Sequence, residues 1–261
     1  MAMTMRRRLL RVATDKEYRR QALERRRLKR LAPYARGLTS LAGPPLTYVH
    51  PISFVNQHHA IFVEGQYSFP TTSFSPRIID GGANIGLACI YWKQRWPQAQ
   101  VTAFEADPSI ASVLRANLSA AGIVDVEVVE SALSDKEGTL RFQRDGGDAG
   151  RLSEGGDLEV SAVRLRPYLR QPVDLLKLDI EGAETDVLLD CADMLDNVAR
   201  IFVEYHSLVG TPQQLGELHD LLASSGFRLH VKTEYCSPQP FWKVIDLLGM
   251  DSQLNVWAVR P

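Results

Sequence analysis

Short apolar runs alternate with helical segments from residue 77 to the end of the chain. The runs show no polar alternation, which is typical of strands buried on both faces of a parallel sheet. Helical segments separate most of the runs, so the sequence predicts an α/β fold with a doubly wound sheet. We expect seven strands, at residues 77–80, 101–104, 126–129, 175–178, 201–203, 227–231 and 254–259.

Two of the connecting helices carry start signals in the sequence. Asp107 precedes Pro108, which predicts an N-cap followed by proline at the first helical position. The run from Thr211 to Gln214 resembles a capping box for a later helix. Both signals place a helix directly after a strand.

Two segments interrupt the alternation. Residues 138–165 hold apolar runs at 139–143 and 158–165 around a glycine-rich loop, which predicts an inserted hairpin with a mobile tip. Residues 232–253 contain two prolines and several aromatic residues, and they look too irregular for a tight final hairpin.

The chain before residue 77 divides into two parts. Residues 4–31 are rich in helix formers and predict a helix, whereas 47–49 and 61–63 are β-branched or aromatic runs that predict short strands. We therefore expect a helical arm at 1–36, an extension with short strands at 37–76, and the main domain at 77–261.

Charge is distributed unevenly, although the chain carries a net charge of only −1. Residues 1–36 hold 13 basic and 3 acidic residues, so a basic arm precedes an acidic body. The acidic charge of the rest of the chain disfavours a nucleic-acid partner, because contacts with phosphate need basic side chains. Three widely spaced cysteines suit a reducing compartment, and no apolar run is long enough to span a membrane, so we expect a cytoplasmic protein.

The run from Ile78 to Gly86 ends a predicted strand and opens a helix. Glycines allow a ligand close to the backbone, and the helix N-terminus offers free N–H groups. The spacing fails the G-x-G-x-x-G pattern of dinucleotide-binding dehydrogenases. An acid at the strand tip suits the amino-acid end of S-adenosylmethionine better than a phosphate. The alternative is an ordinary strand-to-helix turn. Candidate cofactor contacts are Asp80, Gly81, Gly82, Ala83, Asn84 and Gly86.

Acidic residues also follow the other predicted strands. Glu105 ends the second strand, where an acid can bind ribose hydroxyls, and Ala106 comes next. Asp179, Glu204 and His206 follow two further strands, and the carboxyl ends of parallel strands meet at one edge of a sheet. The alternatives are that Asp179 caps the following helix and that His206 stands at a helix start. The acids Glu105, Glu181 and Glu184 would then be solvated.

Methyl transfer to oxygen needs a hydroxyl in line with the sulfonium and a group that takes its proton. Asp179, Glu204 and His206 are therefore the candidate catalytic residues, and Asp179 is also a candidate cofactor contact. Alternatively, a divalent cation such as Mg²⁺ lowers the pKa of the bound hydroxyl. The sequence does not indicate which residues would bind this cation. Lys177 lies within an apolar strand, and we expect it to pair with an acid at the rim and to take no part in the chemistry.

These motifs together resemble the FkbM family of S-adenosylmethionine-dependent methyltransferases over about residues 60–232. The resemblance is carried by the runs 80–86, 104–108 and 177–184, by Leu114 with Asn117, and by 204–206. It implies a class I methyltransferase (Rossmann-like) fold with a seven-stranded sheet whose last strand is antiparallel. It also implies O-methylation of sugars, polysaccharides or other natural products. Gly81 and Ala106 depart from the residues usual in the family.

The resemblance also implies which residues meet the cofactor. Asp80, Gly82, Asn84, Gly86 and Glu105 match cofactor contacts. Ser131 and Ala132, after the third strand, stand where such enzymes usually meet the adenine. Other hypotheses remain open: a non-catalytic binding module on the same fold, and a nicotinamide-dependent oxidoreductase, which the glycine spacing disfavours.

The expected partner is a small-molecule or glycan acceptor. We expect the loop 144–157 and the aromatic stretch 235–242 to form the acceptor pocket. The basic arm is either a solvated or dimer-packing helix, so a homo-oligomer is one alternative, or a peripheral contact with an anionic membrane.

Overall fold

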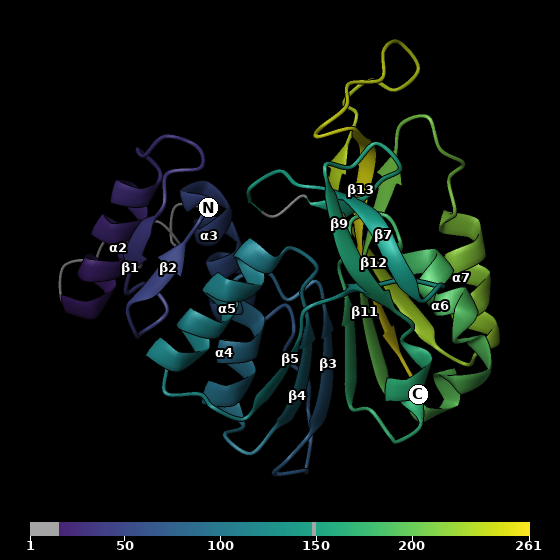
Figure 1. Ribbon diagram of the computed structural model, residues 1–261, viewed down its shortest axis with the longest axis horizontal. Coiled ribbons are helices and arrows are strands. Elements are labelled where there is room, and N and C mark those ends of the chain that lie inside the picture. The colour runs from purple at the N-terminus through teal and green to yellow at the C-terminus, as the bar shows by residue number, and fades with distance from the viewer. Residues whose placement is uncertain (1–15, 148–149) are drawn as a thin grey trace, which may run out of the picture.

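A computed structural model describes residues 16–147 and 150–261 of the chain (Figure 1). A seven-stranded sheet with the order β12-β13-β11-β10-β3-β4-β5 forms its centre. The five strands from β11 to β5 run parallel, and β13 is antiparallel to both β11 and β12. This confirms the predicted class I methyltransferase (Rossmann-like) sheet. Its strands are β3 (Arg77–Gly81), β4 (Gln100–Phe104), β5 (Val126–Val129), β10 (Leu175–Leu178), β11 (Arg200–Leu208), β12 (Arg228–Cys236) and β13 (Met250–Val259).

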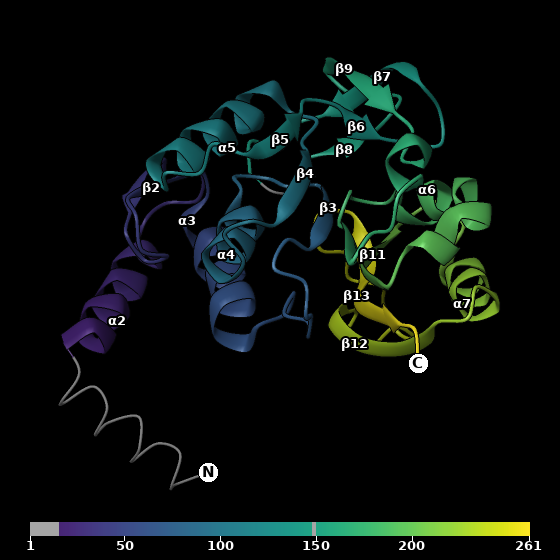
Figure 2. The same ribbon diagram turned by 90° about the horizontal axis from the view of Figure 1, so that it is seen from below.

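Helices cover both faces of the sheet, as Figures 1 and 2 show. The helices α4 (Leu87–Arg95) and α5 (Pro108–Ala120) lie on one face, and α6 (Glu184–Asp190) and α7 (Leu215–Ser224) lie on the other. Successive strand residues point to opposite faces, so Ile78 joins one core and Ile79 the other. Because both faces of the sheet are buried, the sequence of each central strand is a continuous apolar run.

The two predicted helix starts have different outcomes. The Asp107 side chain accepts a hydrogen bond from the Ser109 N–H at 2.7 Å, and α5 begins at Pro108, which confirms the predicted cap. The capping box at Thr211 is wrong, because α7 begins only at Leu215. The Thr211 hydroxyl instead donates to the Leu208 carbonyl within the turn that follows β11.

The insertion after β5 is larger than the predicted hairpin. β7 (Gly138–Gln143) and β9 (Leu158–Val163) do pair antiparallel, as expected. The short strands β6 (Ala132–Leu133) and β8 (Arg151–Leu152) extend them to a sheet with the order β6-β9-β7-β8. A turn of 3-10 helix at Arg166–Leu169 then leads to β10, and another at Ala192–Asn197 leads from α6 to β11.

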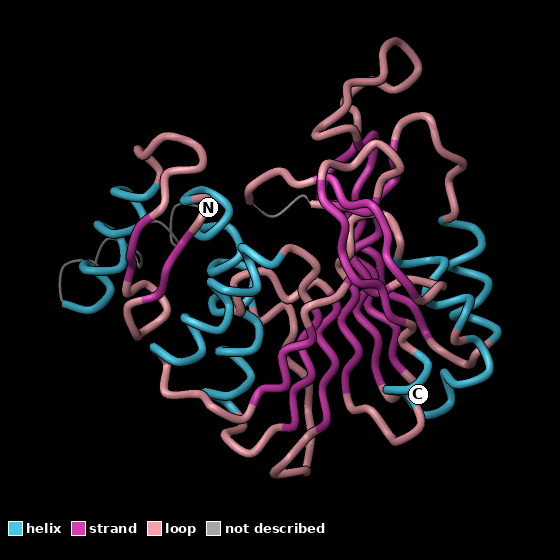
Figure 3. The backbone as a smooth tube through the Cα atoms, in the orientation of Figure 1, coloured by secondary structure: helices cyan, strands magenta, loops and turns pink. Residues whose placement is uncertain are grey.

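The last two strands reach further than the sequence predicted. The segment 232–253 was expected to be irregular, yet β12 continues to Cys236 and β13 starts at Met250. Polar residues of β12 lie on the exposed edge of the sheet, where ladder hydrogen bonds rather than apolar burial define the strand. Only residues 237–249 form the connecting loop, which projects beyond the sheet in Figure 3.

The described chain before residue 77, called the extension from here on, folds against α4 and α5. It contains α2 (Lys16–Leu28), the paired strands β1 (Gly37–Thr39) and β2 (Leu46–Tyr48), and α3 (Pro51–His58). The rest of the predicted 4–31 helix before Lys16 lies outside the described residues. The strand predicted at 61–63 is wrong, because His59–Glu64 is a π-helix. Its Phe62 stacks on His58 and meets the edge of Tyr91, so the segment packs through aromatic contacts that the local pattern did not indicate.

The extension and the sheet share one hydrophobic core. Leu28, Leu46 and Phe54 pack in the same cluster as Ile78 and Leu114. In the described ranges 16–147 and 150–261, we find no helix with both the length and the apolar character needed to cross a membrane.

Candidate active site

A cleft of about 490 Å³ opens at the carboxyl ends of the parallel strands. The residues that follow β3, β4, β5 and β10 contribute to its wall, as the crossover topology requires. Glu204 also lines it, but Glu204 and His206 lie within β11 and not after it, because that strand is longer than the predicted run 201–203. Segments from the extension, the β7–β8 loop and the β12–β13 hairpin complete the wall. The size falls within the usual range for a small-molecule site, roughly 300–1,000 Å³.

The turn after β3 forms part of the cleft wall with its backbone in left-handed conformations. Gly82 has a φ of +74°, and a Cβ there would lie 1.8 Å from the Asp179 carbonyl oxygen, so only glycine fits this position. Asn84 also adopts a positive φ of 49°, and Gly86, the N-cap residue of α4, has a φ of 87°. The N–H groups of Gly82 and Ala83 donate to the Phe104 carbonyl, which joins this turn to β4.

Glu105 lies at the tip of β4 and is held by the backbone on both sides. One carboxylate oxygen accepts from the Asn84 N–H and the other from the Asp107 N–H, both at 2.9 Å. Burial raises the pKa of Glu105 to about 7, against the opposing effect of these two hydrogen bonds. The carboxylate oxygens retain further acceptor capacity, because each has two lone pairs.

A buried ion pair supports the turn from behind. Lys177 Nζ lies 3.1 Å from Asp80 Oδ1 and 3.5 Å from Asp179 Oδ2, which confirms its predicted pairing with an acid. The ammonium also donates to the Gly82 carbonyl at 2.6 Å. Burial opposes the charge of Lys177, but the carboxylates of Asp80 and Asp179 outweigh it and raise the pKa well above its usual value.

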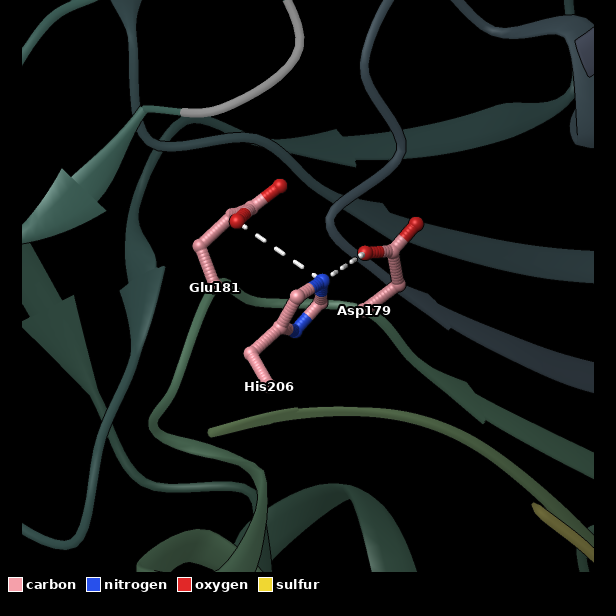
Figure 4. Close-up of side chains that lie close together, drawn as sticks. All are labelled: Asp179, Glu181 and His206. Atoms are coloured by element: carbon pink, nitrogen blue, oxygen red, sulfur yellow. Dashed lines mark ion pairs between the residues drawn. The ribbon is translucent and has the colours of Figure 1, made fainter. Parts of the chain in front are cut away.

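Beside this pair, Asp179, Glu181 and His206 converge, as Figure 4 shows. His206 Nε2 lies 3.7 Å from Glu181 Oε2 and 4.0 Å from Asp179 Oδ1, while Nδ1 lies 2.9 Å from Glu184 Oε1. Glu184 is buried and also accepts from the N–H groups of Ile180 and Gly182. Glu184 therefore fixes both the loop and the orientation of the imidazole.

The acids around His206 hold protons unusually well. Burial raises the pKa of Glu181 and of Glu204 to about 8, and the nearby Asp179 carboxylate adds to both effects. Burial by itself lowers the pKa of His206, but Glu184, Glu181 and Asp179 outweigh it and raise the value to about 10. Gln253 from β13 donates to Glu204 and completes the cluster.

The atoms of Asp179, Glu181 and His206 also meet the distance requirement of a cation site. One ligand atom from each lies within 4.8 Å of the others. A carboxylate pair with a neutral imidazole is a ligand set for several divalent metals. The same cluster can equally manage protons, because its acids and its imidazole are in mutual contact.

The extension and the β12–β13 hairpin form one side of the cleft, which we call the outer wall. This wall is rich in amide and aromatic side chains. Asn56, Gln57 and Gln66 come from the extension, and Gln253 and Asn255 come from β13. The aromatic side chains on this wall are Tyr67 and Tyr235. Amides both donate and accept hydrogen bonds, so this wall suits a ligand with many polar groups.

Most of the residues predicted from the sequence meet at the cleft. Its wall includes Gly82, Ala83, Asn84, Glu105, Ala106, Ser131, Ala132, Asp179 and Glu204. The others lie directly behind this wall: Asp80, Gly81, Gly86 and His206 are all buried. The carboxylate of Asp80 faces Lys177 and the Cys89 thiol, so its direct contact with a cofactor stays a prediction.

Sequence reasoning missed four residues of the site. Glu181 and Glu184 stand in the recognised run 177–184 but were weighed only as solvated acids. The sequence does contain a signal for this turn, namely Gly182. Glu181 and Gly182 both adopt left-handed backbone conformations, which glycine favours. Gln253 and Tyr67 carried no signal, because only the fold brings β13 and the extension to the cleft.

The two segments expected to form the acceptor pocket contribute only in part. Asp145, Gly147 and Gly150 of the glycine-rich loop line the cleft, and residues 148–149 lie outside the described part of the chain. From the aromatic stretch, Tyr235 lines the cleft, whereas Phe241 and Trp242 are exposed.

Comparison with known proteins agrees with the fold. Residues 80–229 match the model of the methyltransferase FkbM domain. Methyltransferase 1 of Beauveria bassiana (strain ARSEF 2860) is 29% identical over 226 residues, which cover 73% of this chain and 85% of that protein. The 2-O-methyltransferase NoeI of Sinorhizobium fredii (strain NBRC 101917 / NGR234) is 30% identical over 156 residues, covering 50% of this chain and 63% of that protein.

Among solved structures, a SAM-dependent methyltransferase from Agrobacterium tumefaciens has the same fold. The TM-score is 0.52 at 11% sequence identity, and the match covers 88% of this chain and 72% of that one. The family match spans more than half of the chain and includes the turn after β3, the acid after β4 and the run around Asp179. The chain therefore belongs to the FkbM methyltransferase family and is a methyltransferase.

Proposed function

We propose that the protein transfers a methyl group from S-adenosylmethionine to a hydroxyl oxygen of a small-molecule or glycan acceptor. One observation carries the proposal: two parts of the site border the same cleft. The first is the turn after β3 together with Glu105 at the tip of β4, and the second is the cluster of acids around His206. A donor held by the first therefore presents its methyl group to an acceptor held by the second.

The turn and the tip of β4 would hold the cofactor. Glu105 has free lone pairs that would accept from the ribose hydroxyls, and Ser131 and Ala132, which line the cleft, would contact the adenine. Gly82 lets the backbone approach the ligand closely. Asp80 acts from behind by holding Lys177, which in turn fixes the carbonyls of Gly81 and Gly82.

The cluster would manage the acceptor's proton. The hydroxyl oxygen attacks the methyl carbon, the carbon–sulfur bond breaks, and the sulfonium becomes a neutral thioether. The proton of the hydroxyl passes to a carboxylate, for which Asp179 and Glu204 are the candidates because both line the cleft. His206, protonated and held by Glu184, organises these carboxylates rather than accepting the proton itself.

A divalent cation such as Mg²⁺ on Asp179, Glu181 and His206 is the alternative route. It would hold the hydroxyl and lower its pKa, so no protein base would be required. The supporting observation is the approach of three ligand atoms to within 4.8 Å of one another. Loss of transfer after chelation, with recovery on adding Mg²⁺, favours the cation; full activity in the chelator favours the base.

The acceptor class rests on the outer wall. Amide side chains from the extension and from β13 suit a polyhydroxylated acceptor, and the name of the related NoeI protein states 2-O-methyl transfer. A non-catalytic binding module is the competing hypothesis. The buried, mutually positioned acids disfavour it, because burying charge without a function costs stability.

Calorimetric titration with S-adenosylhomocysteine tests the cofactor site first. We expect binding to the wild-type protein, none of NAD, and at least about tenfold weaker binding in Glu105→Ala through loss of charged hydrogen bonds. Glu130→Ala, an acid on the surface near the same edge of the sheet, is the matched control. Equal affinity of both variants would remove Glu105 from the cofactor site.

Transfer of labelled methyl groups to a panel of hydroxylated acceptors then tests the chemistry. Asp179→Asn and Glu204→Gln should retain binding of S-adenosylhomocysteine, while the variant that lacks the base loses about 10²–10⁴-fold in kcat. Cofactor binding by the wild-type protein without transfer to any acceptor on the panel would favour the non-catalytic module.

A further inference from the structure

The loop between β12 and β13, residues 237–249, carries an apolar tip that none of the described residues covers. Figures 1 and 3 show it projecting from the body of the protein. Phe241 is fully exposed and Trp242 is 88% exposed, although side chains of this size are usually at least partly buried. We call six residues the hairpin tip: Phe241, Trp242, Val244, Ile245, Leu247 and Leu248.

The loop is held in shape by hydrogen bonds at its base. The buried Ser237 hydroxyl accepts from the Ile245 N–H at 3.0 Å and donates to the Lys243 carbonyl at 3.1 Å. The Tyr235 hydroxyl donates to the Ile245 carbonyl, and the Trp242 N–H donates to the Gln239 carbonyl. The loop backbone therefore presents these side chains outward as a defined surface.

The hairpin tip is continuous with the cleft. Leu247 and Leu248 belong to the tip and also line the cleft, next to the buried Met250. An apolar strip thus runs from inside the cleft to the outermost point of the molecule. Such a strip is larger than the scattered apolar residues that are normal on a protein surface.

The shape of the tip indicates what covers it. It is convex, so a protein partner, including a second copy of this chain, would need an apolar groove to receive it. Three further hollows on the described surface are lined mostly by charged and polar side chains. A lipid bilayer needs no shaped groove, because its acyl region adapts to an inserted side chain.

We propose that the hairpin tip inserts into the interfacial region of a lipid bilayer and brings the mouth of the cleft to the membrane surface. Tryptophan and phenylalanine are favoured at that depth, and Lys243 beside them can keep its charge among the headgroups. Residues 237–249 carry one base and one acid, Lys243 and Asp246. Insertion therefore depends on apolar burial and not on anionic lipid.

Flotation of the full chain with vesicles of neutral phosphatidylcholine tests the proposal. We expect the wild-type protein to float with the vesicles. The double variant Phe241→Ser/Trp242→Ser should bind them at least about tenfold more weakly, because it no longer transfers two large apolar side chains from water to lipid. The matched control is Phe74→Ser/Val124→Ser, which removes two residues that are 87% and 93% exposed elsewhere. Retained binding of S-adenosylhomocysteine shows that each variant is folded.

Three results would overturn the proposal. Equal flotation of both double variants removes the tip from the contact. Flotation only with vesicles that contain phosphatidylglycerol assigns the contact to the basic arm. Absence of flotation, together with a dimer that the Phe241→Ser/Trp242→Ser variant abolishes in sedimentation, assigns the tip to a second copy of the chain. A blue shift of Trp242 emission on neutral vesicles supports insertion.

Discussion

Glu105 shows how a residue's surroundings decide its chemistry. The sequence predicts an acid at the end of a strand, but not that both of its oxygens accept backbone N–H groups. Burial then raises its pKa from 4.5 to about 7. The folded protein therefore binds a proton more tightly than the unfolded chain does, and the stability from this group declines as pH rises through 7.

Substitution of this one acid should change how stability depends on pH. Between pH 5 and 7 the unfolding free energy of Glu105→Gln should fall less steeply with pH than that of the wild type. The two slopes should differ by about 1.4 kcal/mol per pH unit, because the variant lacks the one proton that Glu105 binds in the folded state. Above pH 8 the two slopes should agree, because Glu105 is then ionised in both states. Urea unfolding across this range measures both curves. Parallel curves from pH 5 to 7 would contradict the raised pKa.

At the scale of elements, the site depends on how two strand-to-helix turns touch. The turn after β3 passes so close to the end of β10 that a Cβ on Gly82 would overlap the Asp179 carbonyl oxygen. The sequence indicates a glycine-rich turn, but only the parallel pairing of β3 with β10 reveals why this glycine is required.

Two glycine substitutions separate backbone strain from close approach. Gly82 and Gly122 have φ values of +74° and +71°, but only Gly82 has atoms within 4 Å of an added Cβ. Gly122→Ala should therefore cost about 1 kcal/mol for the left-handed conformation alone. Gly82→Ala should cost more than about 3 kcal/mol and abolish S-adenosylhomocysteine binding, because the turn must shift. Denaturant unfolding and calorimetry measure both effects, and similar losses in the two variants would refute the argument.

At the scale of the whole molecule, the extension before residue 77 behaves as part of one packed body. The Asn117 side chain on α5 accepts from the Thr47 N–H at 2.7 Å and donates to the carbonyls of Thr47 and Ile85. The Trp257 indole of β13 donates to the Gln66 carbonyl. The first and last parts of the chain are therefore joined through the sheet, although a division at residues 36 and 76 remains our prediction for the domains.

Removing the Asn117 amide should destabilise the extension and the sheet together. Asn117→Ala leaves three backbone groups without this partner, which should cost about 2–4 kcal/mol and keep a single unfolding transition. Asn197→Ala, which loses one bond to the Leu169 carbonyl, is a milder comparison. Circular dichroism and tryptophan fluorescence should report the same midpoint in urea. Separate midpoints for the two probes would mean that the extension unfolds independently.

Local sequence patterns were sufficient to predict the sheet and much of the cleft. Seven apolar runs, the turn from Asp80 to Gly86 and the acids after the strands are local patterns, and parallel pairing brings their ends to one edge. Local signals failed where long-range packing decides the conformation, as in the π-helix at His59–Glu64 and the extended edge strand β12.

Only the tertiary structure decided which charges are buried and what they face. It places Asp80 and His206 behind the cleft, gives Lys177 and Glu184 their supporting positions, and adds Gln253 from a strand distant in sequence. It also leaves the hairpin tip uncovered. Burial and contact depend on residues far apart along the chain, and no local pattern encodes them.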